Sequence, residues 1–318
     1  MDEKAVIIAC DFSSKEKLVK FLDQIEDADP NFYCKVGMEL FYTGALNGFN
    51  PVEMIKQRGH KVFLDLKLKD IPNTVGKTAK VLATAGADII NVHADGGFKM
   101  MKKAVDSINA VYDEYENAYK YACTKDVLLP DVQEEISELK QKISSRPILL
   151  GVTVLTSMSQ EELEKEIGVK KTPREQAVSL ALLCKEAGMD GVICSPEEIL
   201  PIKKACGEDF LTITPGIRFI DSMEDDQTRI ATPYCANEMG TNAIVVGRPI
   251  TDAADSVKAY ERCKEEFVEG IGSKEEIENA KVYISNIRDK MLEPADAVAL
   301  ALIEAGAFKV NTEDPYLL

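Results

Sequence analysis

Tryptophan is absent from the sequence, histidine occurs only twice, and no two cysteines are spaced as Cys-x-x-Cys. Structural zinc sites are built from cysteines and histidines at close spacing, so no zinc site is expected. The eight cysteines are scattered over 318 residues, several of them within apolar runs. This distribution is typical of free thiols in a reducing compartment, and it argues against a disulfide framework.

Long hydrophobic runs are also absent. No stretch approaches the roughly 18 apolar residues that a membrane span needs. The chain starts Met1-Asp2-Glu3-Lys4 and continues with six apolar residues, which is too short and too acidic for a signal peptide. We therefore expect a cytoplasmic protein that has no membrane partner.

Positive charge is in deficit, because 38 Lys and Arg residues stand against 54 Asp and Glu residues. The resulting formal net charge of −16 disfavours binding to nucleic acid and to anionic membranes. An anionic small molecule must then be held by a local cluster of cations and backbone amides. With 45% hydrophobic and 29% charged residues, the composition is that of a globular protein and excludes intrinsic disorder.

Short apolar runs, by contrast, recur along most of the chain. Each is four to eight residues long and nearly continuously apolar, which is typical of strands buried on both faces of a parallel sheet. Helical patterns separate the runs, and eight strands alternating with helices predict an α/β fold, the (β/α)8 or TIM barrel. The runs are Ala5–Cys10, Phe32–Val36, Lys61–Leu66, Asp88–Val92, Pro147–Val154, Gly191–Cys194, Phe210–Thr214 and Ala243–Val246.

Three capping boxes predict where helices begin. They are Ser13-x-x-Glu16, Thr172-Pro173-x-Glu175 and Ser273-x-x-Glu276. In such a box the hydroxyl and the carboxylate each accept a hydrogen bond from an otherwise unpaired backbone N–H of the first turn.

Two segments are surplus to a barrel. A helical insertion after the fourth strand, residues 110–146, carries Tyr112, Tyr115 and Tyr119 on one helical face. We expect a helix extension that packs on the barrel, with a docking surface as the alternative. Residues 270–318 form the second surplus segment, a helical C-terminal extension. The barrel domain is therefore expected to span residues 1–269.

Charged side chains follow the predicted strands at the end where TIM barrels carry their chemistry. Asp11 follows the first strand and Lys35 lies in the second, while Asp65, Lys67 and Asp70 lie in or after the third. Asp65 and Lys67 are two residues apart, so an extended strand would project them to the same face. Buried charges are costly unless paired, so this alternation of acid and base indicates a functional site.

Glycine and arginine occur together after the last two predicted strands. These are Gly216 with Arg218, within Thr214-Pro-Gly-Ile-Arg218, and Gly247 with Arg248. The loops after strands seven and eight commonly bind phosphate in this fold. Glycine lets backbone N–H groups approach the phosphate oxygens, and arginine supplies a planar fork of donors.

Taken together, these stretches resemble the orotidine 5′-phosphate decarboxylase family. The resemblance spans residues 5–268, and it departs at Lys69, where the family often has a bulky residue or histidine, and at Asp95, where serine is frequent. It rests on Asp11, Cys34-Lys35-Val36-Gly37, Asp65-x-Lys67-x-x-Asp70-Ile71-Pro72-Asn73-Thr74, Asn91-Val92-His93-Ala94, Val154-Leu155-Thr156-Ser157, Thr214-Pro215-Gly216-Ile217-Arg218 and Gly247-Arg248-Pro249.

The resemblance implies conversion of orotidine 5′-phosphate to uridine 5′-phosphate, the last step of de novo pyrimidine synthesis, with no cofactor and no metal. Lys67 would protonate carbon 6 of the pyrimidine as carbon dioxide leaves, and Asp65 would lie beside the substrate carboxylate. Lys35 and Asp70 would complete the charge network. In the family, each active site contains residues from both subunits. The resemblance therefore also implies a homodimer in which Asp70 and Thr74 reach into the partner's pocket.

The binding residues are likewise implied by the resemblance. Asp11 and Lys35 would bind the ribose hydroxyls, and Thr156 and Ser157 would lie near the pyrimidine. The phosphate would be bound by Arg218, Gln227, Gly247 and Arg248.

Two other functions remain open at this point. A magnesium-dependent sugar-phosphate decarboxylase or aldolase-like enzyme of the same superfamily shares Asp-x-Lys-x-x-Asp, although Ile71-Pro72-Asn73-Thr74 argues against it. The second alternative is a barrel without enzymatic activity that serves only as an assembly partner. Such a protein would not need the intact set of Asp and Lys residues. In addition, residues 299–316 resemble the start of orotate phosphoribosyltransferase, so fusion to or association with that enzyme is an expectation. A simple helical extension is the alternative.

Overall fold

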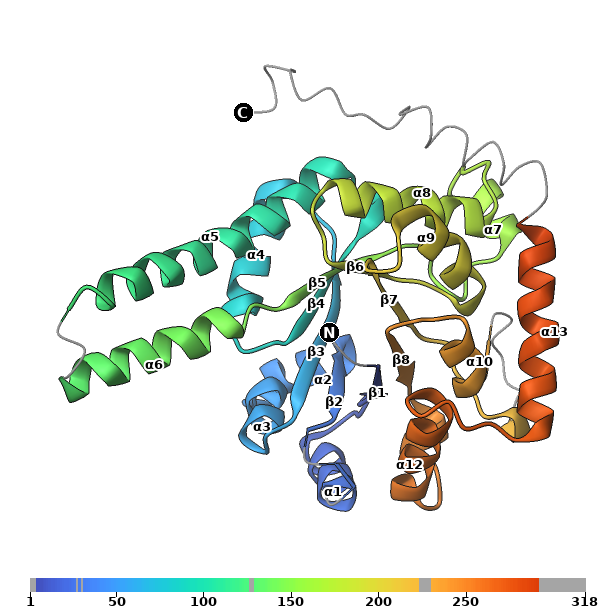
Figure 1. Cartoon of the computed structure of the whole chain (residues 1–318), viewed down its shortest axis with the longest axis horizontal. Helices are drawn as coiled ribbons and strands as arrows, with labels where there is room; N and C mark the ends of the chain where they lie inside the picture. The colour runs from blue at the N-terminus through green and yellow to red at the C-terminus, as the bar shows by residue number, and fades with distance from the viewer. Residues whose placement is uncertain (1–3, 27, 30, 126–128, 223–229, 292–318) are drawn as a thin grey trace.

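The computed structural model describes residues 4–26, 28–29, 31–125, 129–222 and 230–291. Within these residues, eight parallel strands close into a barrel in which each strand pairs with the next along the chain (Figure 1). The closure is made between the first and last strands, where Ala5 pairs with Ala243 and Ile8 with Val246. The predicted (β/α)8 barrel is confirmed.

Every predicted apolar run overlaps one strand, and the bounds differ by no more than two residues. The third strand is the longest because it continues past Leu66 into the charged motif. The strands are β1 (Ala5–Ala9), β2 (Tyr33–Gly37), β3 (Lys61–Leu68), β4 (Ile89–His93), β5 (Ile148–Val152), β6 (Gly191–Ile193), β7 (Leu211–Thr214) and β8 (Ala243–Val246).

Helices follow the strands and surround the barrel, and no helix in the described ranges is long and apolar enough to span a membrane. Short 3-10 turns lie at Ala94–Gly96 (η1), Pro196–Glu198 (η2) and Ile220–Ser222 (η3). The helices are α1 (Lys15–Ile25), α2 (Met38–Asn47), α3 (Pro51–Gln57), α4 (Pro72–Thr84), α5 (Phe98–Ala122), α6 (Pro130–Ser144), α7 (Gln160–Lys165), α8 (Pro173–Glu186), α9 (Ile199–Cys206), α10 (Pro233–Glu238), α11 (Arg248–Thr251), α12 (Ser256–Phe267) and α13 (Lys274–Lys290).

The core has two parts because alternate residues of each strand face opposite sides. Ile7 and Ala9 of β1 join a small cluster inside the barrel with Phe63, Leu150 and other strand residues. Ile8, between them, belongs to the larger cluster between the strands and the helices. This double burial explains why the strands are apolar throughout.

Two of the three predicted capping boxes are confirmed, at Thr172 before α8 and at Ser273 before α13. The first is wrong by one residue. The N-cap of α1 is Ser14, whose hydroxyl accepts from the amide of Lys17. Ser13 instead accepts a hydrogen bond from the Lys17 ammonium at 2.9 Å.

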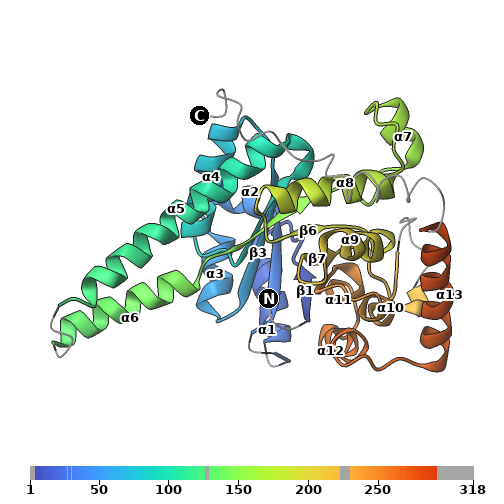
Figure 2. The same cartoon turned by 45° about the horizontal axis from the view of Figure 1, so that its top comes forward.

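The insertion after β4 forms a hairpin of α5 and α6 that projects away from the barrel (Figures 1 and 2). Its tyrosine face packs the two helices together. The Tyr112 hydroxyl donates to the Ser145 carbonyl at 3.2 Å, and the Lys140 ammonium lies 5.8 Å from the centre of the Tyr119 ring. The expectation that the insertion packs on the barrel is therefore wrong for its outer part, because each helix has the other as its apolar partner.

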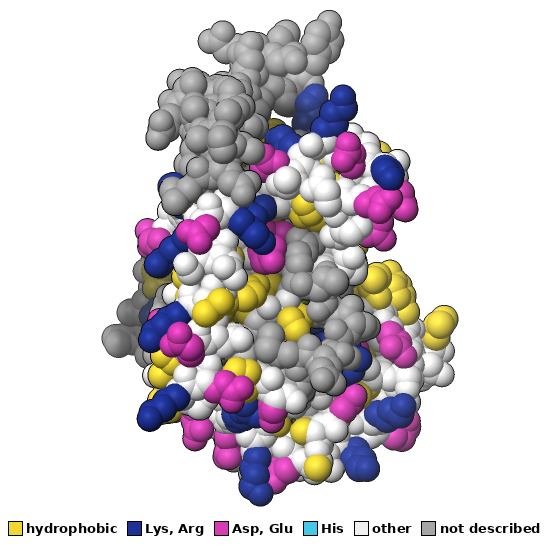
Figure 3. Space-filling view, turned by 90° about the vertical axis from the view of Figure 1, so that its right-hand side faces the viewer, with side chains coloured by type: hydrophobic (Ala, Val, Ile, Leu, Met, Phe, Trp, Pro, Cys, Tyr) yellow, Lys and Arg dark blue, Asp and Glu magenta, His cyan; other side chains and the backbone are white. Residues whose placement is uncertain are grey.

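The last described helix, α13, packs against α10, and its Ala280 and Ile287 side chains are buried in the main core. The expected domain boundary at residue 269 lies just before this helix. Around α13 the molecular surface carries acidic and basic side chains interspersed with small apolar patches (Figure 3).

A buried pair of carboxyl groups joins α12 to α13. Glu266 and Glu276 are each 4% exposed, and each has one oxygen without a hydrogen-bond donor among the described residues. Burial and the neighbouring Glu276 together raise the pKa of Glu266 to about 7, against the opposing effect of Arg262. Burial also acts to raise the pKa of Glu276, but hydrogen bonds from the Ser273 amide and from Glu266 outweigh it and lower that pKa. The proton that the pair keeps therefore resides on Glu266.

The contribution of Glu266 to the free energy of unfolding is expected to fall as pH rises from about 5 to about 8. The folded protein keeps a proton on Glu266 in a range where the unfolded chain, with a pKa near 4.5, has released it. By linkage, stability then decreases with pH until Glu266 is ionised in both states. Glu266→Gln should remove about 1 to 3 kcal/mol of this pH dependence, as measured by urea unfolding at both pH values. Equal pH slopes for the two proteins would contradict a proton held on Glu266.

Candidate active site

The third strand is bulged where the charged motif begins. Lys67 has a φ of 50°, and it is the one non-glycine residue in the described ranges with a positive φ. The pairing of β3 with β4 shifts register between Leu64 and Leu68. The expected extended geometry is therefore wrong at Lys67, although its ammonium still meets the Asp65 carboxylate at 2.8 Å. Positive φ in a residue with a long side chain is strained, and such strain is concentrated at functional sites.

Asn91 of β4 holds this bulge in place. Its side-chain oxygen accepts from the Lys67 amide at 2.8 Å, and its side-chain nitrogen donates to Asp65 at 2.6 Å. The Asn91 side chain therefore has two effects. It accepts the hydrogen bond of the Lys67 N–H, which the bulge removes from the strand pairing, and it orients the Asp65 carboxylate. Sequence analysis missed this role, although a polar residue within the apolar run of β4 is a signal for it.

Four of the predicted residues form a continuous chain of opposite charges. The Lys35 ammonium lies 2.8 Å from Asp11 and 3.5 Å from Asp65, and Asp65 in turn contacts Lys67. They come from the carboxyl ends of β1, β2 and β3, which adjoin one another in the barrel. Lys35 is 9% exposed and Asp65 is 7% exposed, so the centre of the chain is screened little by water.

Mutual attraction keeps the central pair charged. Burial alone would raise the pKa of the Asp65 carboxyl, but Lys35 and Lys67 outweigh it and hold the pKa below its ordinary value. Burial would likewise lower the pKa of Lys35, yet Asp65 and Asp11 raise it above the ordinary value. At neutral pH the site therefore presents fixed anions and cations in alternation.

Asp70 does not join this network within one chain. Its carboxylate is exposed, accepts from the Ile71 amide at 2.6 Å, and forms no ion pair with a described residue. Thr74, in the first turn of α4, is also exposed, as is Ile71 at 66%. The segment that carries these residues thus lies on the surface of the single chain.

The two positions that depart from the family pattern contact each other. The Lys69 ammonium lies 2.6 Å from Asp95, which also lies 3.6 Å from Nδ1 of His93. Burial lowers the pKa of His93, so its imidazole is neutral at pH 7. These three groups form a polar cluster beside the Asp65 and Lys67 pair, at the ends of β3 and β4.

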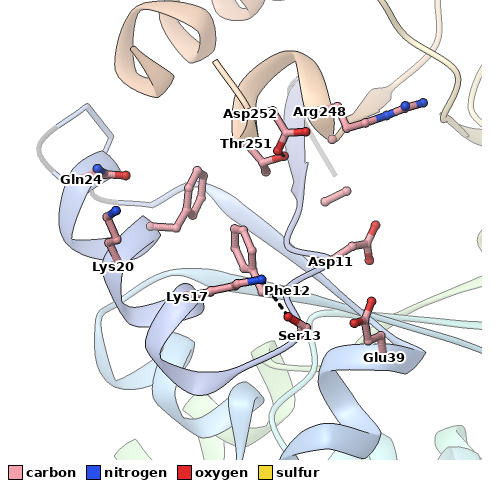
Figure 4. A pocket seen from close by; sticks show the side chains of 13 residues that line it. Asp11, Phe12, Ser13, Lys17, Lys20, Gln24, Glu39, Arg248, Thr251 and Asp252 are labelled. Carbon is pink, nitrogen blue, oxygen red and sulfur yellow. Dashed lines mark hydrogen bonds between the residues drawn. The ribbon is translucent and has the colours of Figure 1, made fainter. Parts of the chain in front are cut away.

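Asp11, Gly247 and Arg248 line a common cavity of about 500 Å³ between α1 and α11 (Figure 4). Sequence analysis missed the other side of this cavity, where Lys17 and Lys20 of α1 contribute. The apolar rings of Phe12 and Phe21 also line it, and no polar motif marked them in the sequence.

Three of the remaining predicted residues follow the carboxyl ends of β5 and β7. Thr156 and Ser157 lie in a turn after β5 and do not line the cavity. Arg218, after β7, is 6% exposed; its amide donates to the Ala231 carbonyl at 3.0 Å and its Nη1 to that of Ile217 at 2.8 Å. Gln227 lies outside the described residues.

Comparison with known proteins shows the family of this chain. The family model described as "Orotidine 5'-phosphate decarboxylase / HUMPS family" matches residues 4–263. The orotidine 5′-phosphate decarboxylase of Bacillus cytotoxicus is 41% identical over 268 residues, which cover 84% of this chain and 98% of that protein. The protein of the same name from Bacillus mycoides is 40% identical with the same coverage.

Solved structures agree as well. The crystal structure of orotidine 5′-phosphate decarboxylase from Lactobacillus acidophilus superposes with a TM-score of 0.63 at 38% identity, covering 83% of this chain and 99% of that one. An uncharacterized conserved protein from Geobacillus kaustophilus gives 0.62 at 35% identity, covering 82% and 99%. By sequence and by fold, this chain belongs to the orotidine 5′-phosphate decarboxylase / HUMPS family.

Proposed function

We propose that this protein decarboxylates orotidine 5′-phosphate to uridine 5′-phosphate without a cofactor. The observation that carries the proposal is the chain of alternating charges that runs from Asp11 through the buried pair of Lys35 and Asp65 to Lys67, at the mouth of the barrel. The names of the relatives support the same reaction. The product is the uridine nucleotide of pyrimidine biosynthesis.

Lys67 is the proton donor in this proposal. The bond between carbon 6 and the carboxylate breaks, carbon dioxide leaves, and the electron pair stays on carbon 6. That pair is not conjugated with the ring, so a cation fixed in advance is what can stabilise it. Lys67 then transfers a proton to carbon 6, and its amine recovers a proton from water.

Asp65 acts on the substrate carboxylate. At about 4 Å two such anions repel by roughly 4 kcal/mol at an effective dielectric constant of 20. The departure of neutral carbon dioxide relieves this repulsion. Contacts with Lys35, Lys67 and Asn91 restrain the orientation of the Asp65 carboxylate, so it cannot turn freely to avoid the substrate.

The rest of the nucleotide is assigned by the resemblance to the family. Asp11 and Lys35 bind the ribose hydroxyls, and Thr156 and Ser157 lie near the pyrimidine. The phosphate is bound after β7 and β8 by Arg218, Gln227, Gly247 and Arg248. The loops after these two strands are where this fold most often binds phosphate.

Two copies of the chain complete each site in this proposal. Asp70 and Thr74 reach into the partner's pocket, which accords with the surface position of the segment and with the exposed Ile71 beside it. The proposed association with orotate phosphoribosyltransferase rests on residues 299–316, which lie outside the described residues.

Turnover of orotidine 5′-phosphate in the presence and absence of EDTA tests the function. We expect equal rates, because the proposed chemistry uses only Lys67 and its neighbours. The described residues contain no group of three or more His, Cys, Asp or Glu side chains placed to hold a metal ion. Loss of activity in EDTA that magnesium restores would favour the magnesium-dependent sugar-phosphate enzyme instead. No turnover in either condition would refute the proposal.

Arg248→Ala is expected to raise KM and to lower kcat, each by about tenfold or more. The phosphate is remote from carbon 6, yet its binding energy is used to order the site around the reacting group. Steady-state kinetics separate the two effects. A change in KM alone would mean that Arg248 contributes only uniform binding, and it would contradict the ordering argument.

A further inference from the structure

Arg262 of α12 is the centre of a charged cluster that does not touch the Lys67 network. Its Nε donates to Glu266 at 2.6 Å, and its Nη1 donates to both carboxylate oxygens of Asp221 at 3.1 and 3.2 Å. The guanidinium carbon lies 4.0 Å from the centre of the Phe219 ring. One side chain thus stacks on an aromatic ring, donates to the Glu266 carboxyl group and pairs with the Asp221 carboxylate, a combination that only arginine provides.

Two of these contacts lie just beyond Arg218. Backbone pairing holds the start of the loop after β7, where Arg218 and Gly216 bond to Ala231. Beyond Arg218, the Arg262 guanidinium stacks on the Phe219 ring and donates hydrogen bonds to Asp221 in η3. The position of the Arg218 backbone is therefore fixed on both sides.

Helix α13 contributes a third carboxyl group to the Arg262 cluster. The Glu276 carboxylate lies 3.6 Å from Nη2 of Arg262, and the Ser273 capping box fixes Glu276 at the start of the helix. The Glu266 and Glu276 side chains are 6% and 5% exposed, against 35% for Arg262. Exposed ion pairs are weak and mobile, but carboxylates this deeply buried do not rearrange freely. The family match ends at residue 263, so α13 lies beyond it.

We propose that Arg262 is a positioning residue for the substrate phosphate, acting through residues 218–221, and that α13 braces it through Glu276. The proposal rests on the function proposed above, because it assigns Arg218 to the phosphate. Arg262 itself does not touch the substrate. Its effect should therefore be confined to substrates that carry the phosphate.

The test compares orotidine 5′-phosphate with orotidine, the same molecule without the phosphate, at high enzyme concentration. In Arg262→Met, kcat/KM for the phosphorylated substrate should fall by about 10- to 100-fold, while that for orotidine changes less than about twofold. Asp221→Asn should act in the same direction by about three- to tenfold. The Asp221 side chain is 69% exposed, so this variant keeps the fold even if Arg262→Met does not.

Glu276→Ala tests the brace and should also lower only the rate with the phosphorylated substrate. Arg146→Met is the matched control. Arg146 pairs with Asp190 at 3.2 Å at the opposite end of the barrel, before β5 and β6, and its loss should leave the ratio of the two rates unchanged.

Equal losses with both substrates in Asp221→Asn would reduce Arg262 to a structural role and overturn the proposal. An unchanged ratio in Glu276→Ala would overturn the part assigned to α13. A wild-type protein that does not turn over orotidine 5′-phosphate would instead refute the proposed function.

Discussion

Replacing Lys67 by alanine is expected to reduce turnover of orotidine 5′-phosphate by at least about 1,000-fold. The substitution removes both the cation that faces the developing charge on carbon 6 and the proposed proton donor. Lys35, the other described ammonium of the network, cannot take its place because it is engaged by Asp11 and Asp65. Binding of uridine 5′-phosphate should change little, since the ribose and phosphate contacts remain.

Single-turnover kinetics and calorimetric titration with uridine 5′-phosphate separate these two effects. Lys69→Ala is the matched control, because Lys69 is another strand-end lysine whose ammonium pairs with Asp95 and lies outside the Asp11 to Lys67 network. This control should keep most of the activity. A Lys67→Ala protein that retains a tenth of the wild-type kcat would remove Lys67 from the mechanism.

The barrel could be predicted from the sequence because its strands carry their own signal. A strand that is buried on both faces must be apolar throughout, and that requirement holds whatever the neighbouring strands are. The charged ends of β1, β2 and β3 could be predicted for the same reason. Asp11, Lys35 and Asp65 interrupt or follow apolar runs, and parallel strands bring their carboxyl ends to one edge of the barrel.

The bulge at Lys67 could not be predicted in the same way. The left-handed backbone there depends on Asn91, which belongs to the next strand and supplies the missing hydrogen bond. The hairpin of α5 and α6 is a second example. An amphipathic helix presents the same pattern whether its partner is a barrel or another helix, so the tyrosine face predicted burial but not the partner.

A shared active site predicts that two inactive variants restore each other. In the proposed dimer, Lys67 serves its own pocket and Asp70 serves the partner's, so Lys67→Ala and Asp70→Asn should each be inactive alone. The exposure of Asp70, in the turn between β3 and α4, makes this reach sterically feasible. In a hybrid two-fold dimer, one pocket receives both defects and the other receives neither.

Random subunit exchange between equal amounts of the two variants makes about half of the dimers hybrid. Each hybrid has one intact pocket of two, so roughly a quarter of the wild-type activity per site should return. Activity is measured before and after exchange, and native mass spectrometry or differently tagged subunits establish independently that hybrids have formed. A Lys67→Ala protein mixed with Lys67→Ala carrying a different tag controls for activation by the exchange procedure itself, since none of its pockets can be repaired. If hybrids form and their activity stays at background, Asp70 acts in the site of its own subunit. The Asp70 carboxylate would then have to move from the surface into that site when the substrate binds.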